Sequence, residues 1–180
     1  IYGIISASGN DTQSTGDGGD AGGGAGGSIY LAADNISGAP SAPISVRGGS
    51  SIDNLSQESL GGGGGGGCIY VDYTTELLIN RTSFVAEGGQ GAQRGGAGFV
   101  YIKQNTQDGD LYLINGGTNA SSTPAVSTQF VDMTVDSVTV ASSTTFVLGD
   151  SKSLTINDSL AFASSTNSST ETFLLLSNDI

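Results

Sequence analysis

The sequence predicts an all-β protein, because two patterns of short strands divide the chain between them and no helical pattern competes. A strand–glycine repeat fills the first part, and apolar residues alternate with polar ones through the second. Apolar residues at helical spacing do not persist for more than two turns anywhere in the chain. Short strands of this kind favour a parallel β-helix or β-solenoid with glycine-rich loops; the alternative is a β-sandwich or jelly roll.

The repeat begins with three short apolar segments that each run toward glycine. They start at Ile5, Ile44 and Phe84, so that successive copies are 39 and 40 residues apart. Each copy then continues through a polar stretch into a glycine tract and a second short strand. Periods of this length are typical of solenoids, in which each repeat buries its core only against its neighbours. We therefore expect the three copies to stack.

The second strand of each copy is centred on a tyrosine with an aliphatic residue on either side. These tyrosines are Tyr30, Tyr70 and Tyr101. Because side chains alternate along a strand, one face of each strand is apolar and the other carries the ring. Stacked copies would align the three rings as a ladder on one face of a sheet.

The glycine tracts have two interpretations. The longest tract, residues 61–67, shows the choice most clearly. A phosphate-binding loop is excluded, because a strand pattern rather than a helix follows the tract and no Lys accompanies it. The tracts are either flexible linkers or places where backbones approach so closely that a Cβ would clash. Their recurrence in register with the strands favours close approach.

The second part of the chain has a different composition. Only one glycine, Gly149, follows Gly117, and 24 of the 60 residues from 121 to 180 are Ser or Thr. Apolar residues recur there at i and i+2 between polar turns, which predicts short strands. We expect a glycine-rich β-repeat region over 1–117 and a Ser/Thr-rich β-strand region over 118–180, continuous as one elongated domain.

Composition excludes several classes of partner and chemistry. The net charge is −12, with five Lys and Arg residues, so a nucleic-acid backbone would be repelled. No stretch approaches the length of apolar residues needed to span a bilayer, so we expect no membrane insertion. The chain has no His and one Cys, which removes His catalysis and Cys/His metal sites.

Asparagine indicates the cellular location. Seven of the ten Asn residues stand in N-x-Ser/Thr sequons, the acceptor motif for N-glycans on secreted proteins. The alternative is that a chain rich in Ser, Thr and Asn forms sequons by chance. We expect an extracellular or cell-surface protein with covalent N-glycans. The sequon residues are Asn10, Asn35, Asn54, Asn80, Asn119, Asn157 and Asn167.

Carboxylate pairs are the candidates for catalysis. A glycosidase needs two carboxylates, one of them with a raised pKa. The pairs Asp132/Asp136 and Asp108/Asp110 have no basic or aromatic residues gathered nearby in the sequence. A solvated acidic surface explains them better, and we expect no enzymatic activity.

Asp17 and Cys68 are the remaining candidates for chemistry. Asp17 and Asp20 lie in a glycine-rich stretch that faintly resembles a calcium-binding β-roll. The spacing does not repeat, so we expect no cofactor and keep calcium as the alternative. Cys68 has no His to activate it. It aligns with Ser28 and Phe99, which indicates a buried small residue; an intermolecular disulfide is the alternative.

The strand, glycine pair, polar loop and glycine-run strand of residues 1–103 resemble the glycine-rich repeat segments of large extracellular proteins in plants, algae and ciliates. The Ser/Thr-rich remainder looks like the rungs of a parallel β-helix, as in surface adhesins. The resemblance implies a secreted, structural or adhesive β-solenoid glycoprotein, and no catalytic residues come with it.

The predicted function is structural. Both ends of the chain are apolar and strand-like without a protecting cap, and exposed edges of that kind pair with other chains. We expect a subunit of a glycosylated extracellular filament or surface coat, which joins head-to-tail with copies of itself by β-strand pairing. The alternative is an adhesin or carbohydrate-binding module that uses an exposed ladder of Tyr30, Tyr70 and Tyr101. The expected assembly residues are Ile1, Tyr2, Ile4, Ile5, Phe173, Leu174, Leu175 and Leu176.

Overall fold

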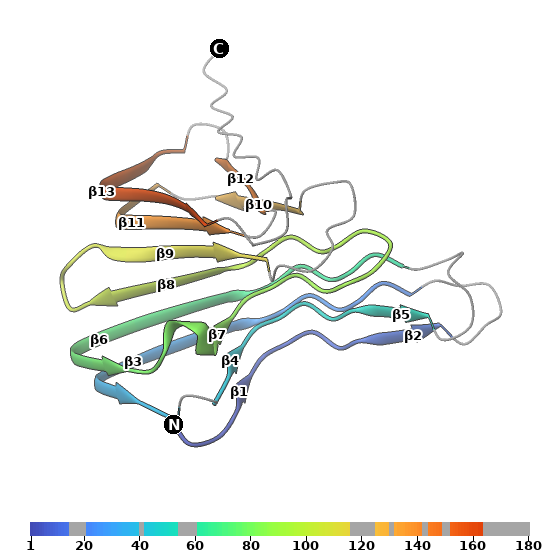
Figure 1. The fold of residues 1–180 in the computed structure, drawn as a ribbon, viewed down its shortest axis with the longest axis horizontal. Helices are drawn as coiled ribbons and strands as arrows, with labels where there is room; N and C mark the ends of the chain where they lie inside the picture. The colour runs from blue at the N-terminus through green and yellow to red at the C-terminus, as the bar shows by residue number, and fades with distance from the viewer. Residues whose placement is uncertain are drawn as a thin grey trace, which may run out of the picture.

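The computed structural model is built from β-strands, as the sequence predicts (Figure 1). It describes residues 1–14, 21–39, 42–53, 61–115, 125–129, 132–141, 144–148 and 152–163. Within these ranges the backbone forms thirteen strands and a single turn of 3-10 helix, η1 (Arg81–Ser83). The all-β class is confirmed.

The largest sheet has six strands in the order β13-β11-β9-β8-β6-β3. We call it the large sheet. Its members are β3 (Ser28–Ser37), β6 (Cys68–Leu78), β8 (Phe99–Gln104), β9 (Gly109–Ile114), β11 (Met133–Ala141) and β13 (Leu154–Ala163).

A second layer lies against one face of the large sheet. It contains the small sheet, in the order β1-β4-β7, and the pair β2-β5 beside it (Figure 1). A further pair, β10-β12, lies beside β9 and β11. These shorter strands are β1 (Ile5–Ser6), β2 (Thr12–Ser14), β4 (Ile44–Ser45), β5 (Ser51–Asp53), β7 (Phe84–Val85), β10 (Ala125–Gln129) and β12 (Thr144–Leu148).

The three sequence repeats pair with one another in parallel and in register. We number them repeat 1 (1–39), repeat 2 (42–79) and repeat 3 (80–104). In the small sheet Ile5 faces Ile44, and Ile44 faces Phe84. In the large sheet Tyr30, Tyr70 and Tyr101 are direct partners, and so are the residues Ser28, Cys68 and Phe99. The expected alignment of the copies is therefore confirmed.

The glycine tracts pack against each other between the two layers. Backbone hydrogen bonds run from the Gly49 N–H to the Gly24 C=O (2.7 Å), from Gly64 to Gly49 (2.9 Å) and from Gly89 to Gly64 (2.8 Å). A Cβ added to Gly64 would lie 2.0 Å from the Gly24 carbonyl oxygen, far inside contact distance. Close backbone approach is confirmed at these positions, and the flexible-linker interpretation is wrong for them.

Side chains build the rest of the interior as two separate cores. The first lies between the small sheet and the large sheet, and the second lies on the opposite face of the large sheet, where β12 contacts β9 and β11. The first core includes Ile44, Val46, Ile69, Val71, Phe84, Val100 and Ile102. The second includes Tyr101, Leu111, Leu113, Val135, Val138 and Val140.

The large sheet changes direction after repeat 3. β8 and β9 form an antiparallel pair, whose turn places Asn105 at a φ of 55°. Asn tolerates this left-handed conformation better than most residues. β11 and β13 then continue the large sheet parallel to β9, whereas no described strand follows β7 in the small sheet. The two layers therefore end at different levels on this side.

The compositional boundary near residue 117 does not interrupt the large sheet. β9 precedes it and β11 follows it, yet the two strands pair from Val138–Leu111 to Ala141–Ile114. The Ser/Thr-rich strands thus continue a sheet that the glycine-rich repeats begin.

Candidate functional site

The end of the molecule formed by repeat 1 leaves two strand edges without a partner strand among the described residues. β1 pairs with β4 alone, and β3 pairs with β6 alone. Figure 1 shows both strands at the bottom of the molecule, one in each layer. The layers are joined there by backbone bonds, from the Gly27 N–H to the Ala7 C=O (2.7 Å) and from the Gly24 N–H to the Asn10 C=O (3.0 Å). We call this surface the repeat-1 end.

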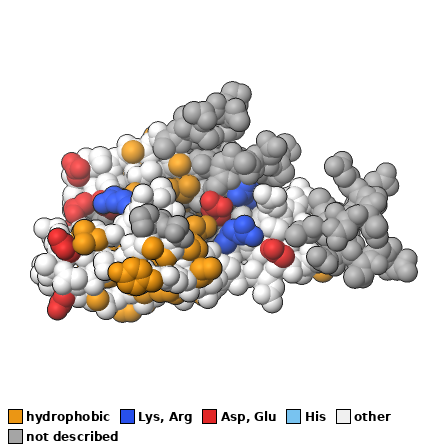
Figure 2. All heavy atoms as spheres, turned by 60° about the horizontal axis from the view of Figure 1, so that its bottom comes forward, with side chains coloured by type: hydrophobic (Ala, Val, Ile, Leu, Met, Phe, Trp, Pro, Cys, Tyr) orange, Lys and Arg blue, Asp and Glu red, His pale blue; other side chains and the backbone are white. Residues whose placement is uncertain are grey.

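The repeat-1 end carries apolar side chains and few charged ones. Residues 1–10 and 21–33 contain no Asp, Glu, Lys or Arg, although the chain carries a net charge of −12. Tyr2, Ile4 and Tyr30 expose 93%, 72% and 64% of their surface. Figure 2, which turns this end forward, shows hydrophobic side chains gathered there. Natural edge strands are usually protected by charges, Pro or bulges. β3 has such protection only in its second half, at Asp34 and the adjoining bulge, so residues 28–33 and β1 lack it.

The structure divides the predicted assembly residues into two groups. Tyr2 and Ile4 are exposed at the repeat-1 end, whereas Ile1 and Ile5 are partly buried against the first core. The C-terminal set lies outside the described residues: Phe173, Leu174, Leu175 and Leu176.

The opposite side of the glycine layers is closed by a side chain, Asn115. Its amide is 2% exposed; Oδ1 accepts the Gly88 N–H (2.8 Å) and Nδ2 donates to the Gly95 C=O (3.2 Å). The side chain supplies one acceptor and one donor where another glycine segment would supply backbone groups. Sequence reasoning missed Asn115, because an Asn before Gly-Gly is indistinguishable from a turn residue.

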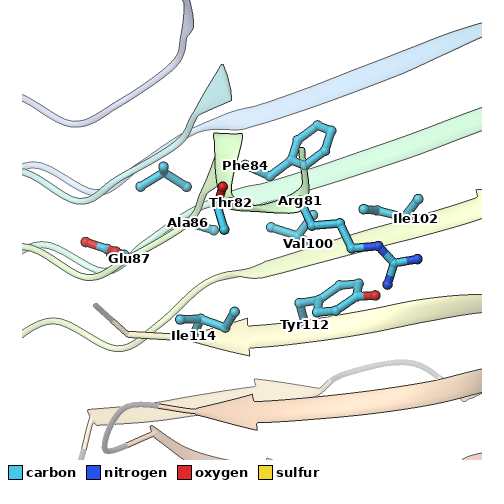
Figure 3. Close-up of a pocket in the computed structure, with 10 residues that line it drawn as sticks. Arg81, Thr82, Phe84, Ala86, Glu87, Val100, Ile102, Tyr112 and Ile114 are labelled. Atoms are coloured by element: carbon cyan, nitrogen blue, oxygen red, sulfur yellow. The ribbon is translucent and has the colours of Figure 1, made fainter. Parts of the chain in front are cut away.

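An apolar groove of about 280 Å³ lies beside β7, at the position that a fourth strand of the small sheet would take. Figure 3 shows Phe84 and Ala86 along its upper side and Tyr112 and Ile114 along its lower side. The groove exists because β9 extends the large sheet while no described strand extends the small one. Its lining residues are Arg81, Thr82, Phe84, Val85, Ala86, Glu87, Val100, Ile102, Tyr112 and Ile114.

A polar cluster fixes Arg81 at the mouth of this groove. The Arg81 guanidinium lies 3.1 Å from the Asp110 carboxylate and 5.1 Å from the centre of the Tyr112 ring. Asp110 also accepts hydrogen bonds from the hydroxyl groups of Tyr112 (3.2 Å) and Ser137 (2.5 Å). These contacts engage Asp110 structurally and join η1 to β9 and β11.

The tyrosine ladder forms in the predicted order but is not uniformly exposed. Ring centroids are 5.2 Å apart for Tyr30 and Tyr70 and 5.1 Å apart for Tyr70 and Tyr101. Tyr101 is only 6% exposed, because it belongs to the second core and accepts the Gly109 N–H at its hydroxyl oxygen (3.1 Å). The expectation of three exposed rings is therefore wrong for Tyr101, and a surface platform consists of Tyr30 and the half-buried Tyr70.

A lysine lies beside this platform. The Lys103 ammonium is 3.0 Å from the Asp72 carboxylate and 5.9 Å from the centre of the Tyr70 ring. The hydrogen bond that Lys103 donates to Asp72 raises the pKa of Lys103, so the group stays charged at physiological pH. Tyr70 thus has a cation on one side and Tyr30 on the other.

The sequons in the described part of the chain present their asparagines to solvent. Asn10, Asn35, Asn80 and Asn157 are all exposed. Asn80 accepts the Thr82 N–H (3.0 Å), and Asn157 donates to Asp108 (2.9 Å). The remaining three lie outside the described residues: Asn54, Asn119 and Asn167. Exposure of the side chain is what a glycan acceptor requires.

The carboxylates proposed as catalytic candidates are engaged in hydrogen bonds. Asp108 accepts from Asn157, and Asp132 accepts from the Ser153 N–H (2.8 Å) and hydroxyl (3.1 Å). The bonds from Ser153 lower the pKa of Asp132, the opposite of what a general acid needs. Asp136 is half-buried in β11.

Metal and thiol chemistry find little support in the described residues. Within these residues no group of three or more His, Cys, Asp or Glu side chains is arranged to hold a metal ion, and Asp17 and Asp20 lie outside them. Cys68 is half-buried rather than buried, with its sulfur 2.9 Å from the Ser28 hydroxyl oxygen. Among the segments that the structure describes, no helix has the length and apolar character to cross a membrane.

Comparison with protein-family models, with curated proteins and with solved structures finds no match to this chain.

Proposed function

We propose that this chain is a structural subunit of a glycosylated extracellular coat or filament, which assembles with copies of itself by β-strand pairing at the repeat-1 end. Its repeats form a short solenoid-type stack, in which glycine layers join two sheets. The observation that carries the proposal is a pair of strand edges at one end of the stack. Among the described residues β1 and β3 have no further partner strand there, and residues 1–10 and 21–33 have no charged side chain.

The physical reason is the cost of leaving such edges free. An edge strand exposes a row of N–H and C=O groups that is a template for another strand, and pairing two such edges buries apolar surface as well. Tyr2, Ile4 and Tyr30 would lose much of their exposure in that contact. The exposed Asn80 and Asn157, which lie outside β1 and β3, support an extracellular setting in which glycans would cover the remaining surface.

Sedimentation velocity and negative-stain electron microscopy test the proposal on the 180-residue chain, before and after glycosidase treatment. The blocking variant is Ala32→Lys. Ala32 is exposed on β3 and faces Asp72 of β6, whose carboxylate already pairs with Lys103. The new ammonium can share that carboxylate or extend into solvent, so the fold should persist. The control is Thr155→Lys, at an exposed position on β13, the other edge of the large sheet.

We expect the parent chain and Thr155→Lys to associate and Ala32→Lys to weaken association at least tenfold with an unchanged melting temperature. A parent chain that stays monomeric at hundreds of micromolar would refute the proposal, and so would equal association of both variants.

A second function, carbohydrate binding, is favoured by one observation: the Tyr30 and Tyr70 rings lie side by side with Tyr30 largely exposed. Sugar rings stack on such aromatic surfaces. Glycan-array binding that is lost in Tyr30→Ser and retained in Tyr30→Phe would establish it. Binding that is unchanged in Tyr30→Ser would exclude this platform.

A further inference from the structure

We infer that the contact at the repeat-1 end is a two-fold one, in which β3 pairs antiparallel with β3 of a second copy while β1 pairs antiparallel with its own counterpart. The inference rests on the proposed function and specifies its partner and symmetry. It replaces the head-to-tail arrangement that the sequence alone suggests, and because a two-fold contact closes on itself, the unit of the proposed coat or filament is then a dimer.

The repeat-1 end presents one strand edge from each layer. β1 and β3 are the outermost strands of their layers at the same end of the molecule, and the glycine bonds from Gly24 and Gly27 hold them together (Figure 1). A partner that continues one layer must therefore accommodate the other layer too. Only a surface with two strand edges at matching levels can do so.

The opposite end, beside β7, does not present two strand edges at matching levels. Among the residues that the structure describes, the small sheet ends at β7, but the large sheet continues past β8 with β9, β11 and β13. A second copy that placed its β1 against β7 would place its β3 in the position that β9 occupies. Continuation of both layers head-to-tail is sterically blocked, so the groove beside β7 cannot receive a complete repeat 1.

The repeat-1 end, by contrast, matches itself. A two-fold axis along the sheet normal maps each layer onto itself and makes both new strand pairs antiparallel at once. An isologous interface of this kind places each residue near its own counterpart, where like charges would repel. The charge-free stretches 1–10 and 21–33 satisfy that condition in both layers. The first charged residue of β3 is Asp34, next to its bulge.

Tyr30 gives the contact a specific side chain. One side of its ring packs on Tyr70, and the residue remains 64% exposed. Antiparallel pairing of two β3 strands would bring the two Tyr30 rings to the same face of a continuous sheet. The tyrosine ladder would then run through both copies and end at Tyr101 in each.

Single-cysteine cross-linking distinguishes the two symmetries. In a Cys68→Ser background, which removes the thiol 2.9 Å from Ser28, the substitutions Ser28→Cys, Tyr30→Cys and Ala32→Cys scan one face of β3. Near a two-fold axis a residue meets its own counterpart, and a disulfide needs Cβ atoms about 4 Å apart. In a head-to-tail contact no residue of β3 meets itself.

We expect at least one of these chains to oxidise within minutes to a covalent dimer of two 17.9 kDa chains and to stop there. Thr155→Cys, on the far edge of the large sheet, is the matched control and should remain uncross-linked. Sedimentation of the parent chain is measured in parallel. Filaments or higher oligomers without self-cross-linking would overturn the two-fold inference and leave strand-paired assembly intact. A chain that remains monomeric and uncross-linked would overturn both proposals.

Discussion

The glycine segments and the strands of the same repeats stack in one register, but different chemistry holds them. The strands bury side chains such as Ile69 and Val71 between two sheets. The glycine segments have no side chains to bury, and backbone bonds such as Gly64 N–H to Gly49 C=O connect them across the layers. The glycine segments of each repeat therefore cannot accommodate an extra carbon, whereas the side-chain core between the strands tolerates small changes in side-chain volume.

The largest effect should come from adding one carbon to the glycine layers. Gly64→Ala would place its Cβ 2.0 Å from the Gly24 oxygen, and both partners are backbone, so the layers must separate. We expect a loss of about 3 kcal/mol or more in the free energy of unfolding, beyond ordinary overpacking. Urea denaturation followed by circular dichroism measures it.

Gly65→Ala is the matched control for Gly64→Ala. It lies in the same tract, but its Cβ would meet no heavy atom closer than the Gly96 oxygen at 3.9 Å. We expect a change within about 1 kcal/mol, with a gain in stability allowed, because Ala restricts the unfolded chain. Equal losses in the two variants would show that tract flexibility, rather than close approach, determines stability.

The strands and the glycine segments also differ from the rest of the fold in how well the sequence predicts them. Spacing located the copies, because Tyr30, Tyr70 and Tyr101 each stand between aliphatic residues and so fix one register. The stacking of the glycine tracts could also be predicted, since tracts such as 61–67 recur in register with the strands. The groove beside β7, where no described strand continues the small sheet, could not be predicted. It depends on β9 reversing direction after Asn105.

The candidate site was predictable only in part. The uncharged stretch 1–10 was visible in the sequence and lies at an open edge. Burial of Tyr101 was not visible, because it results from β9 and β11 extending the sheet over that face. Arg81 and Asn115 were also missed, since their partners are backbone or carboxylate groups distant in sequence and no local spacing connects them.

The second-largest effect should come from Asn115, where a side chain completes the glycine layers. Asn115→Ala leaves the buried Gly88 N–H and Gly95 C=O without their partners. Each buried polar group left unpaired costs about 1–3 kcal/mol, so we expect a loss of about 3 kcal/mol in total. Hydrogen exchange provides a second readout, because the Gly88 amide should lose protection before amides of the strands do.

Asn105→Ala is not a suitable control, because Asn105 has a positive φ. Gln93→Ala serves instead, since Gln93 is exposed and lies in repeat 3 between Gly88 and Gly95, the two partners of Asn115. If Asn115→Ala and Gln93→Ala were equally stable, the layers would not depend on their cap.

A smaller effect should come from removing one carbon from the strand core. Ile69 is fully buried, and Ile69→Val is expected to cost about 1 kcal/mol. Ile114→Val, at a 42% exposed position, should cost less than half of that. Thermal denaturation compares the pair. A loss for Ile69→Val as large as that for Gly64→Ala would erase the proposed distinction between the two parts.

The smallest effect should be a pH dependence at Tyr101, where the ladder enters the second core. Burial raises the pKa of Tyr101, and the bond from the Gly109 N–H opposes this only in part. An unfolded tyrosine ionises near pH 10, so the unfolded chain loses this proton first as the pH rises. The contribution of Tyr101 to stability is therefore complete below about pH 10 and declines as the pH rises through its folded pKa.

Tyr101→Phe keeps the ring and removes the titration. At pH 8 the parent chain should be more stable than Tyr101→Phe by about 1 kcal/mol, the value of the hydrogen bond from Gly109, and this difference should shrink by pH 11. Urea denaturation at both pH values measures the difference. A gap that is constant or widens would show that Tyr101 ionises at least as readily in the folded chain as in the unfolded one.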